Sequence, residues 1–359
     1  MFAPKPTEVV ANIPASTPFV GPETLERQMG KRFELRLGAN ESLFGPSPLA
    51  VEAMGRATEQ GQFYGDPEGW ELRSEIASLN GCSIENVVFA SGIDELLMLF
   101  SRAFLAPGDV AVTTQGSYPT LEYAVKSVGG TLEYAQYANC KVDLAELADV
   151  AGRSRAKIVY VANPDNPSGS WQHIKLEVPD GALMIMDEAY SDFAPEVDNT
   201  ITPSLVRMRT FSKGHGMAGI RIGYALCDAD HVATLNKIRM HFGVSIVAQA
   251  GALAALRDTS HLKFVIGETK EVRKWLAGEV LELGFGSIES HTNFLTIGLG
   301  SRARAEHVLT ALREESVFIR KPALSPLDGH IRVTIGPQAV MEEFLKRFRR
   351  ILDRPSSVR

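Results

Sequence analysis

Residues 210–223 read TFSKGHGMAGIRIG, and this stretch decides between two kinds of α/β fold. Its inner GHGMAG matches the G-x-G-x-x-G fingerprint of dinucleotide-binding proteins, which lies between a strand and a helix. The residues that follow, 220–226, are β-rich and contain a further glycine, so they predict a strand instead of a helix. Asp228 and Asp230 also come too early for the acidic residue that the fingerprint carries roughly 20 residues on. An NAD-dependent oxidoreductase is therefore a remote alternative.

The same stretch carries a lysine surrounded by anion-binding groups. Lys213 stands directly before the first glycine, the hydroxyls of Thr210 and Ser212 precede it, and Arg221 follows the last glycine. Small residues let a ring approach the backbone, and a guanidinium fork suits a phosphate. A phosphorylated aldehyde cofactor needs such an amine beside phosphate donors. Taken alone, such a stretch more often contains a solvated surface lysine in a glycine loop. The neighbouring motifs therefore have to distinguish a cofactor-binding lysine from a surface lysine.

Short apolar runs alternate with amphipathic stretches over most of the chain. Strands are predicted at 87–90, 110–114, 131–134, 157–162, 182–186, 204–211 and 219–226, and helices at 48–60, 69–79, 92–105, 119–128 and 143–152. This alternation predicts an α/β fold with a mostly parallel sheet that helices cover on both faces.

The last third of the chain has a different texture. Helices are predicted at 246–257, 261–283, 302–315 and 337–352, and strands at 292–298, 317–320 and 330–335. We therefore expect a proline-rich N-terminal arm (1–45), a large ligand-binding domain (46–245) and a smaller α+β domain (246–359).

Three more motifs follow predicted strands. NPDNPSG occupies 163–169, MDEAY occupies 186–190, and ASGIDE occupies 90–95, where a helix begins. Ligands of open α/β sheets bind beyond the carboxyl ends of the strands, and free N–H groups at a helix start bind anions. Asp187 ends an apolar strand, where a carboxylate needs a partner such as a protonated pyridine nitrogen. Each motif alone could be a turn or a helix cap, but the ordered set favours a site for the phosphorylated aldehyde.

These motifs together resemble the fold-type-I pyridoxal-phosphate aminotransferases, and most closely their histidinol-phosphate aminotransferase branch. The resemblance extends from LGANESLFGPSP (37–48) and YGDPEGWELR (64–73) to HIRVTIG (330–336). It implies an aspartate-aminotransferase-like fold with a seven-stranded type of sheet, pyridoxal 5′-phosphate as cofactor, and transfer of an amino group to 2-oxoglutarate. L-Histidinol phosphate is the first candidate donor. Aromatic or other amino acids are the alternative donors, and a decarboxylase or lyase of the same fold would share every cofactor residue.

The resemblance also implies the roles of the catalytic residues. Lys213 would bind the cofactor aldehyde and later carry a proton between Cα of the substrate and the cofactor. Asp187 would keep the pyridine nitrogen protonated. Asn166 and Tyr190 would bind the 3′-oxygen of the ring, and Tyr118 would stack on the ring face.

Further residues are assigned to the cofactor phosphate and to the substrate by the same resemblance. The phosphate would be held by the backbone of Ile93 and Asp94 and by the side chains of Thr210, Ser212 and Arg221. Tyr64 would reach the phosphate from a second subunit, which implies a homodimer with shared active sites. The substrate would be bound by Arg332, Arg320 and Asn40.

Two positions depart from the family pattern. The arm carries Phe19 where the family often has a tyrosine near the substrate phosphate, and Gly214-His215 follows the lysine in place of a small-aromatic pair. Phe19 favours an aromatic donor, whereas Arg320 and Arg332, on short neighbouring strands, favour a dianion. The arginines outweigh the phenylalanine, because losing a charged fork costs more than losing one neutral hydrogen bond.

Composition excludes several other classes of protein. A net charge of −6 gives no electrostatic reason to expect nucleic acid or an anionic membrane as a partner. Cys82, Cys140 and Cys227 are sparse and lack metal-ligand spacing, so they predict reduced thiols in the cytoplasm and no metal site. Neither a signal peptide nor a membrane span is predicted. A regulator of this fold would need a DNA-binding module, for which the arm leaves no room.

Overall fold

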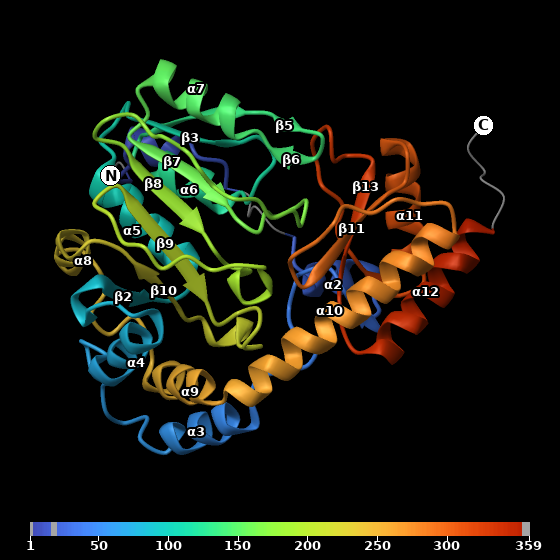
Figure 1. The fold of residues 1–359 in the computed structure, drawn as a ribbon, viewed down its shortest axis with the longest axis horizontal. Helices are drawn as coiled ribbons and strands as arrows, with labels where there is room; N and C mark the ends of the chain where they lie inside the picture. The colour runs from blue at the N-terminus through green and yellow to red at the C-terminus, as the bar shows by residue number, and fades with distance from the viewer. Residues whose placement is uncertain (1–2, 16–19, 354–359) are drawn as a thin grey trace.

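The computed structural model describes residues 3–15 and 20–353. The largest sheet has seven strands, in the order β2-β10-β9-β8-β7-β3-β4 (Figure 1). The strands are β2 (Val87–Ala90), β3 (Val110–Thr114), β4 (Thr131–Ala135), β7 (Ile158–Ala162), β8 (Leu183–Asp187), β9 (Leu205–Thr210) and β10 (Gly223–Leu226). Only β10 runs antiparallel to its neighbours. The prediction of a mostly parallel α/β sheet is confirmed.

Helices cover both faces of this sheet. On one face, α5 (Ile93–Phe104), α6 (Thr120–Ser127) and α8 (Ala229–Asn236) share a core with the strands. The other face is covered by α7 (Leu144–Ser154) near β3 and β7, and by α3 (Pro48–Thr58), α4 (Trp70–Asn80) and α9 (Ile246–Arg257) near β2 and β10. Burial of both faces explains why the strands read as continuous apolar runs.

A second core lies beside the large sheet, at the far end of the long helix α10 (Thr259–Glu282) (Figure 1). It contains an antiparallel pair, β11 (Phe294–Gly298) with β13 (His330–Thr334), and a parallel pair, β1 (Leu35–Arg36) with β12 (Val317–Phe318). Helices α11 (Arg302–Glu314) and α12 (Gln338–Leu352) pack on these strands. The N-terminal segment contributes α1 (Glu8–Ala11) and α2 (Pro22–Met29), and the pair β5 (Tyr137–Ala138) and β6 (Lys141–Val142) follows β4.

The packing bears on the expected domain limits. Helix α9 shares its core with α3 and α4 on the large sheet, whereas Leu37 of the N-terminal segment belongs to the second core. This packing favours a boundary after α9 instead of at residue 245. The division into domains stays a prediction.

Two local differences from the sequence prediction surround the opening motif. The strand expected at 219–226 begins only at Gly223, because residues 218–220 form a 3₁₀ turn and Arg221 has a φ of 60°. Helix α8 was missed, and Asp228 is its N-cap, since its side chain accepts a hydrogen bond from the N–H of Asp230 at 2.9 Å. The acidic residue tested against the dinucleotide fingerprint is therefore a helix cap.

Candidate active site

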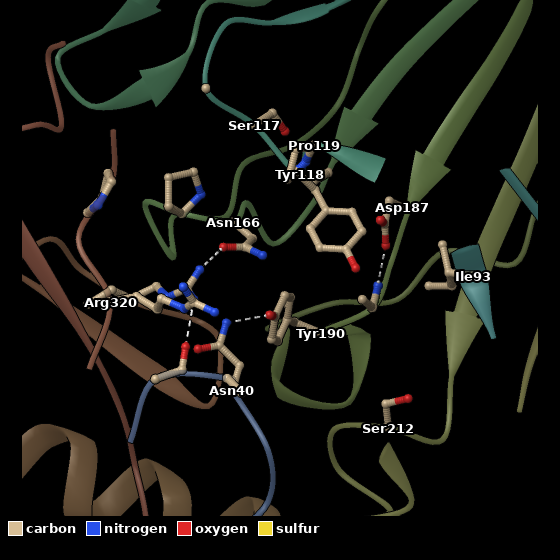
Figure 2. Close-up of a pocket in the computed structure, with 18 of the residues that line it drawn as sticks. Asn40, Ile93, Ser117, Tyr118, Pro119, Asn166, Asp187, Tyr190, Ser212 and Arg320 are labelled. Carbon is tan, nitrogen blue, oxygen red and sulfur yellow. Dashed lines mark hydrogen bonds between the residues drawn. The ribbon is translucent and has the colours of Figure 1, made fainter. Parts of the chain in front are cut away.

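A cavity of about 850 Å³ opens at the carboxyl ends of the parallel strands (Figure 2). All of the predicted site residues except Tyr64 line it: Asn40, Ile93, Asp94, Tyr118, Asn166, Asp187, Tyr190, Thr210, Ser212, Lys213, Arg221, Arg320 and Arg332. In Figure 2, Arg320 lies on one side of the cavity, with Ile93 and Ser212 on the opposite side. The cavity therefore has two ends, with Tyr118, Asp187 and Tyr190 between them.

Lys213 follows β9 and lies inside the cavity. Its Nζ donates a hydrogen bond to the carbonyl oxygen of Asn40 at 3.1 Å and lies 5.6 Å from the ring centre of Tyr190. Burial, with a contribution from the charge of Arg332, lowers the pKa of Lys213 to about 8. An amine with a lowered pKa is neutral more often near pH 7, which is what a nucleophile or a proton acceptor requires.

The glycines after Lys213 serve close packing within the chain. A Cβ on Gly216, whose φ is +69°, would collide with the carbonyl oxygen of Gly45. A Cβ on Gly214 would collide with a carboxylate oxygen of Asp192. These glycines therefore hold the lysine loop against two neighbouring segments.

Asp187 ends β8 as a buried carboxylate that lines the cavity. Its Oδ2 accepts a hydrogen bond from the hydroxyl of Tyr160 at 2.6 Å, and its Oδ1 accepts one from the N–H of Ala189 at 3.0 Å. Both donors are neutral, and burial raises the pKa of Asp187 to about 6. A buried carboxylate with neutral donors suits a protonated nitrogen as its partner in the cavity.

The start of α5 forms an anion-binding end of the cavity. Gly92 precedes the helix with a φ of 87°, and a Cβ there would lie 2.7 Å from a guanidinium nitrogen of Arg221. The glycine therefore lets Arg221 approach the free N–H groups of the first helical turn. The hydroxyls of Thr210 and Ser212 lie 2.9 Å apart beside it. N–H groups, hydroxyls and a guanidinium at one place suit a phosphate.

Asp94 connects this end to the aromatic wall of the cavity. The hydroxyl of Tyr118 donates to Oδ1 of Asp94 at 3.1 Å, while Arg221 pairs with Oδ2 at 3.3 Å. Burial and the charge of Asp94 raise the pKa of Tyr118, so its hydroxyl stays protonated. One carboxylate thus orients both the ring and the cation.

Two arginines form the opposite end of the cavity. The backbones of Arg320 and Arg332 face each other in an antiparallel bridge, with N–H···O distances of 3.2 and 2.7 Å. Residues paired in this way carry their side chains on the same face. Arg332 donates to the side-chain oxygen of Asn166 and, at 3.0 Å, to the carbonyl of Gly38, and Arg320 donates to the carbonyl of Val20 at 2.7 Å. Within the described residues, Nε of Arg332 is buried without a hydrogen-bond partner.

Asn40 lies between the two ends. It is buried with a φ of 55°, and its Nδ2 donates to the hydroxyl of Tyr190 at 2.7 Å. Its carbonyl oxygen accepts hydrogen bonds from Lys213 and, at 3.0 Å, from the side chain of Asn293. Burial raises the pKa of Tyr190 to about 12. Asn40 therefore holds Tyr190 and Lys213 in a fixed relation.

Two residues singled out in the sequence do not line the cavity. Tyr64 is 84% exposed on the outside of the chain, where its ring centre lies 4.7 Å from that of Phe242. His215 belongs to the lysine loop but does not line the cavity, and its buried ring centre lies 5.0 Å from that of Phe211. Phe19 lies outside the described residues.

Other residues at the cavity were missed from the sequence. Gln115, Glu122, Tyr134 and Lys321 line it, although no role was predicted for them. Tyr160, the hydrogen-bond donor to Asp187, was also missed, although a tyrosine within an apolar strand signals a buried hydroxyl that needs a partner. The partner itself could not be inferred, because it depends on the order of strands.

Comparison with known proteins defines the class. The chain belongs to the aminotransferase class I and II family, whose sequence model matches residues 34–348. The protein is a pyridoxal-phosphate-dependent aminotransferase with an aspartate-aminotransferase-like fold, as the motifs predicted.

Its relatives include several histidinol-phosphate aminotransferases. The one from Moorella thermoacetica is 30% identical, over 97% of this chain and 93% of the relative. Histidinol-phosphate aminotransferase 1 from Mesorhizobium japonicum is 31% identical, over 96% and 98%. The crystal structure of the Sinorhizobium meliloti histidinol-phosphate aminotransferase in complex with pyridoxal-5′-phosphate is 36% identical with a TM-score of 0.92, covering 96% of this chain and 97% of that one. Aspartate aminotransferase from Thermotoga maritima shares the fold, with a TM-score of 0.80 at 22% identity. The match covers 97% of this chain and all of that one.

The described residues also bear on membranes and metals. None of the helices within 3–15 and 20–353 has the length and apolarity to cross a membrane. The same residues contain no group of three or more histidine, cysteine, aspartate or glutamate side chains arranged for a metal ion.

Proposed function

We propose that this aminotransferase moves the amino group of L-histidinol phosphate to 2-oxoglutarate. The observation that carries the proposal is the pairing of Arg320 with Arg332, which brings two guanidinium groups to one end of the cavity. Two guanidinium forks suit the phosphate dianion of the donor better than they suit a single carboxylate. The distal carboxylate of 2-oxoglutarate would use the same arginines. The similarity to several histidinol-phosphate aminotransferases supports this assignment.

The central residues fit the chemistry of the cofactor, which supplies an aldehyde that takes up amino groups and a ring that accepts electron density. Lys213 would hold the aldehyde and, once the donor amine has taken its place, would accept the proton from Cα of the donor. Its lowered pKa supports this role, because only the neutral amine can accept a proton. Asp187 would hold the proton of the pyridine nitrogen, and Asn166 and Tyr190 would bind the 3′-oxygen.

The anion-binding end at α5 fits the cofactor phosphate. The N–H groups of Ile93 and Asp94, the hydroxyls of Thr210 and Ser212, and the guanidinium of Arg221 would hold it there. Tyr118, oriented by Asp94, would lie against the ring. The arginine end then remains for the substrate, with Asn40 beside it.

We also propose a homodimer in which Tyr64 completes the partner's active site. The ring of Tyr64 packs against the exposed ring of Phe242, and the same two segments of the chain expose further large apolar side chains, namely Phe63, Trp70 and Met240. A group of exposed apolar side chains of this kind indicates a contact surface. The free cysteines agree with an enzyme that acts in the cytoplasm, which is part of the proposal.

Mixed dimers test the shared site. Lys213→Ala and Tyr64→Ala are each expected to abolish or strongly reduce activity when prepared alone. In a hybrid dimer, one site combines the native Lys213 of one subunit with the native Tyr64 of the other. Co-expression of both variants should therefore restore roughly a quarter of native activity, since half of the dimers are hybrids with one intact site. Activity that stays at the level of the single variants would refute the shared site.

Turnover with a panel of donors tests the substrate. L-Histidinol phosphate, L-phenylalanine and L-aspartate would each be supplied with 2-oxoglutarate, and kcat/KM compared. The proposal expects the highest value for L-histidinol phosphate. An aromatic amino acid is the second candidate, because Tyr134 and Leu324 add apolar surface to the cavity wall. A preference for phenylalanine would replace the first proposal with the second.

A further inference from the structure

We propose that Tyr160 is a positioning residue that keeps the shared proton of Asp187 and the cofactor on the pyridine nitrogen. The inference rests on the proposed role of Asp187 and adds a residue that no motif contains. It follows from a short hydrogen bond between two buried side chains on neighbouring strands.

The hydroxyl of Tyr160 donates its hydrogen bond to Asp187. Tyr160 lies in β7 with 0% of its surface exposed, packed in the core under α5 and α6. Strand β7 pairs with β8 so that Ala162 faces Asp187, and Tyr160 reaches the carboxylate from two residues earlier on the same strand. The distance from its hydroxyl to Oδ2 is 2.6 Å. Because Tyr160 is fully buried, water cannot replace Asp187 as the acceptor.

A carboxylate and a pyridine nitrogen can share a proton in two ways. Either the nitrogen carries the proton and the pair is charged, or the carboxyl group carries it and both partners are neutral. Burial favours the neutral arrangement, and the raised pKa of Asp187 expresses this preference. Hydrogen bonds donated to the carboxylate favour the charged arrangement.

The groups that face Asp187 balance these effects. Tyr160 and the N–H of Ala189 donate to its two oxygens. The negative charge of Asp94 raises the pKa of Asp187, and the positive charge of Lys213 lowers it. The pKa of Tyr160 is itself raised well above its usual value by burial and by Asp187, so the phenol remains a donor. Removal of its hydroxyl leaves one direct donor and moves the balance toward the neutral pair.

The chain offers a matched control for this substitution. Tyr137 is also buried, and its hydroxyl lies 3.0 and 3.1 Å from the two oxygens of another buried carboxylate, Asp165. Tyr137→Phe therefore removes the same chemical contact from a different carboxylate. Asp165 does not line the cavity, whereas Asp187 does.

The experiment measures where the proton lies. Holoenzyme is prepared with pyridoxal phosphate labelled with ¹⁵N in the ring, and the ¹⁵N chemical shift is recorded for the native protein, Asp187→Asn, Tyr160→Phe and Tyr137→Phe. Asp187→Asn marks the position of a neutral nitrogen. Tyr160→Phe should move the resonance from the native position toward that of Asp187→Asn, and Tyr137→Phe should leave it unchanged.

A kinetic measurement adds a second readout. Loss of a hydrogen bond to a charged group should slow Cα proton removal by about ten- to a hundredfold in Tyr160→Phe. The affinity for the donor should stay the same, because Tyr160 does not line the cavity. A change confined to donor affinity would contradict the inference.

The outcomes separate this inference from the assignment on which it rests. A native resonance in Tyr160→Phe, or an equal displacement in Tyr137→Phe, would overturn the role of Tyr160 alone. A native resonance in Asp187→Asn would overturn the role of Asp187 as well. Should Tyr160→Phe fail to fold, 3-fluorotyrosine at position 160 provides a stronger donor of nearly the same shape. It should move the resonance away from that of Asp187→Asn, and an unmoved resonance would count against the inference.

Discussion

Arg320→Ala should separate the two candidate donors. In the proposed complex, the phosphate of L-histidinol phosphate contacts both Arg320 and Arg332, whereas the single carboxylate of L-phenylalanine needs only Arg332. The substitution also removes the hydrogen bond to the carbonyl of Val20 and the packing of the guanidinium 5.0 Å from the ring centre of Phe318. These two losses affect both donors equally, so the ratio of the two rates isolates the contact with the anion.

The magnitude follows from the chemistry of a partly exposed guanidinium. A hydrogen bond to a charged group contributes about 1.5–3 kcal/mol, and a unit charge pair at 4 Å about 4 kcal/mol at an effective dielectric constant near 20. Because Arg320 is partly exposed, solvent screens part of this interaction. We expect a loss of about 2–3 kcal/mol for histidinol phosphate, or about 30- to 150-fold in kcat/KM. For phenylalanine, the expected loss is about threefold or less.

Single-turnover mixing with the donor alone is the appropriate assay, because 2-oxoglutarate would use the same arginines. The spectral change of the cofactor reports the donor half-reaction, and its dependence on donor concentration gives kcat/KM. Arg304→Ala is the control, since Arg304 also lies over a ring, 4.6 Å from the centre of Phe285, but outside the cavity. Equal losses for both donors in Arg320→Ala would refute the assignment of this arginine to the substrate dianion.

Three further predictions concern Lys213, Asp187 and Gly216. In the apoprotein, the rate at which pyridoxal phosphate attaches should rise with pH and level off above about pH 8, because the pKa of Lys213 is lowered to about 8 and only the neutral amine reacts. Borohydride should then fix the cofactor on Lys213. Fixation on another lysine would contradict the assignment. Burial raises the pKa of Asp187, so the folded apoprotein binds the proton of this carboxyl group more tightly than the unfolded chain does. The stabilisation from this bound proton is complete below about pH 4 and is lost as the pH rises through about 6. Relative to Asp187→Asn, the free energy of unfolding of the native apoprotein should fall by up to about 3 kcal/mol between pH 4 and pH 7, as measured by urea denaturation, and parallel curves would contradict the shift. Gly216→Ala should destabilise the protein by at least about 1–2 kcal/mol and weaken cofactor binding, because of its positive φ and the contact with Gly45, whereas Gly219→Ala, with open space around it, should do neither. Equal thermal stability of these two variants would contradict the packing role of Gly216.

The large sheet could be predicted because each strand is marked locally. Both faces are buried, so the strands are continuous apolar runs, and the motifs stand at their carboxyl ends. Asp187 at the end of β8 is the clearest case, since a carboxylate in such a position needs a partner. The cavity residues that belong to these motifs came together as the order of motifs had indicated.

What the sequence did not reveal depends on contacts between distant segments. The arginines were expected on neighbouring strands, but their direct pairing depends on how residues 321–329 fold between them. Helix α9 is rich in small residues, and nothing in its sequence says whether it packs on the large sheet or in the second core. Asp228 carried a local signal for α8, because an aspartate directly before a helical stretch is a common N-cap.

The contact between Gly216 and the backbone at Gly45 bears on what a glycine motif can tell. In a dinucleotide-binding protein, missing side chains make room for a ligand, and the spacing of the glycines reflects the shape of that ligand. Here the missing side chains make room for another part of the same chain, 171 residues earlier in the sequence. In both situations the position must be a glycine, but the group that occupies the space of the missing side chain differs. A search for the glycine pattern detects only the glycines, so the group that contacts them has to be inferred from the segments before and after the motif.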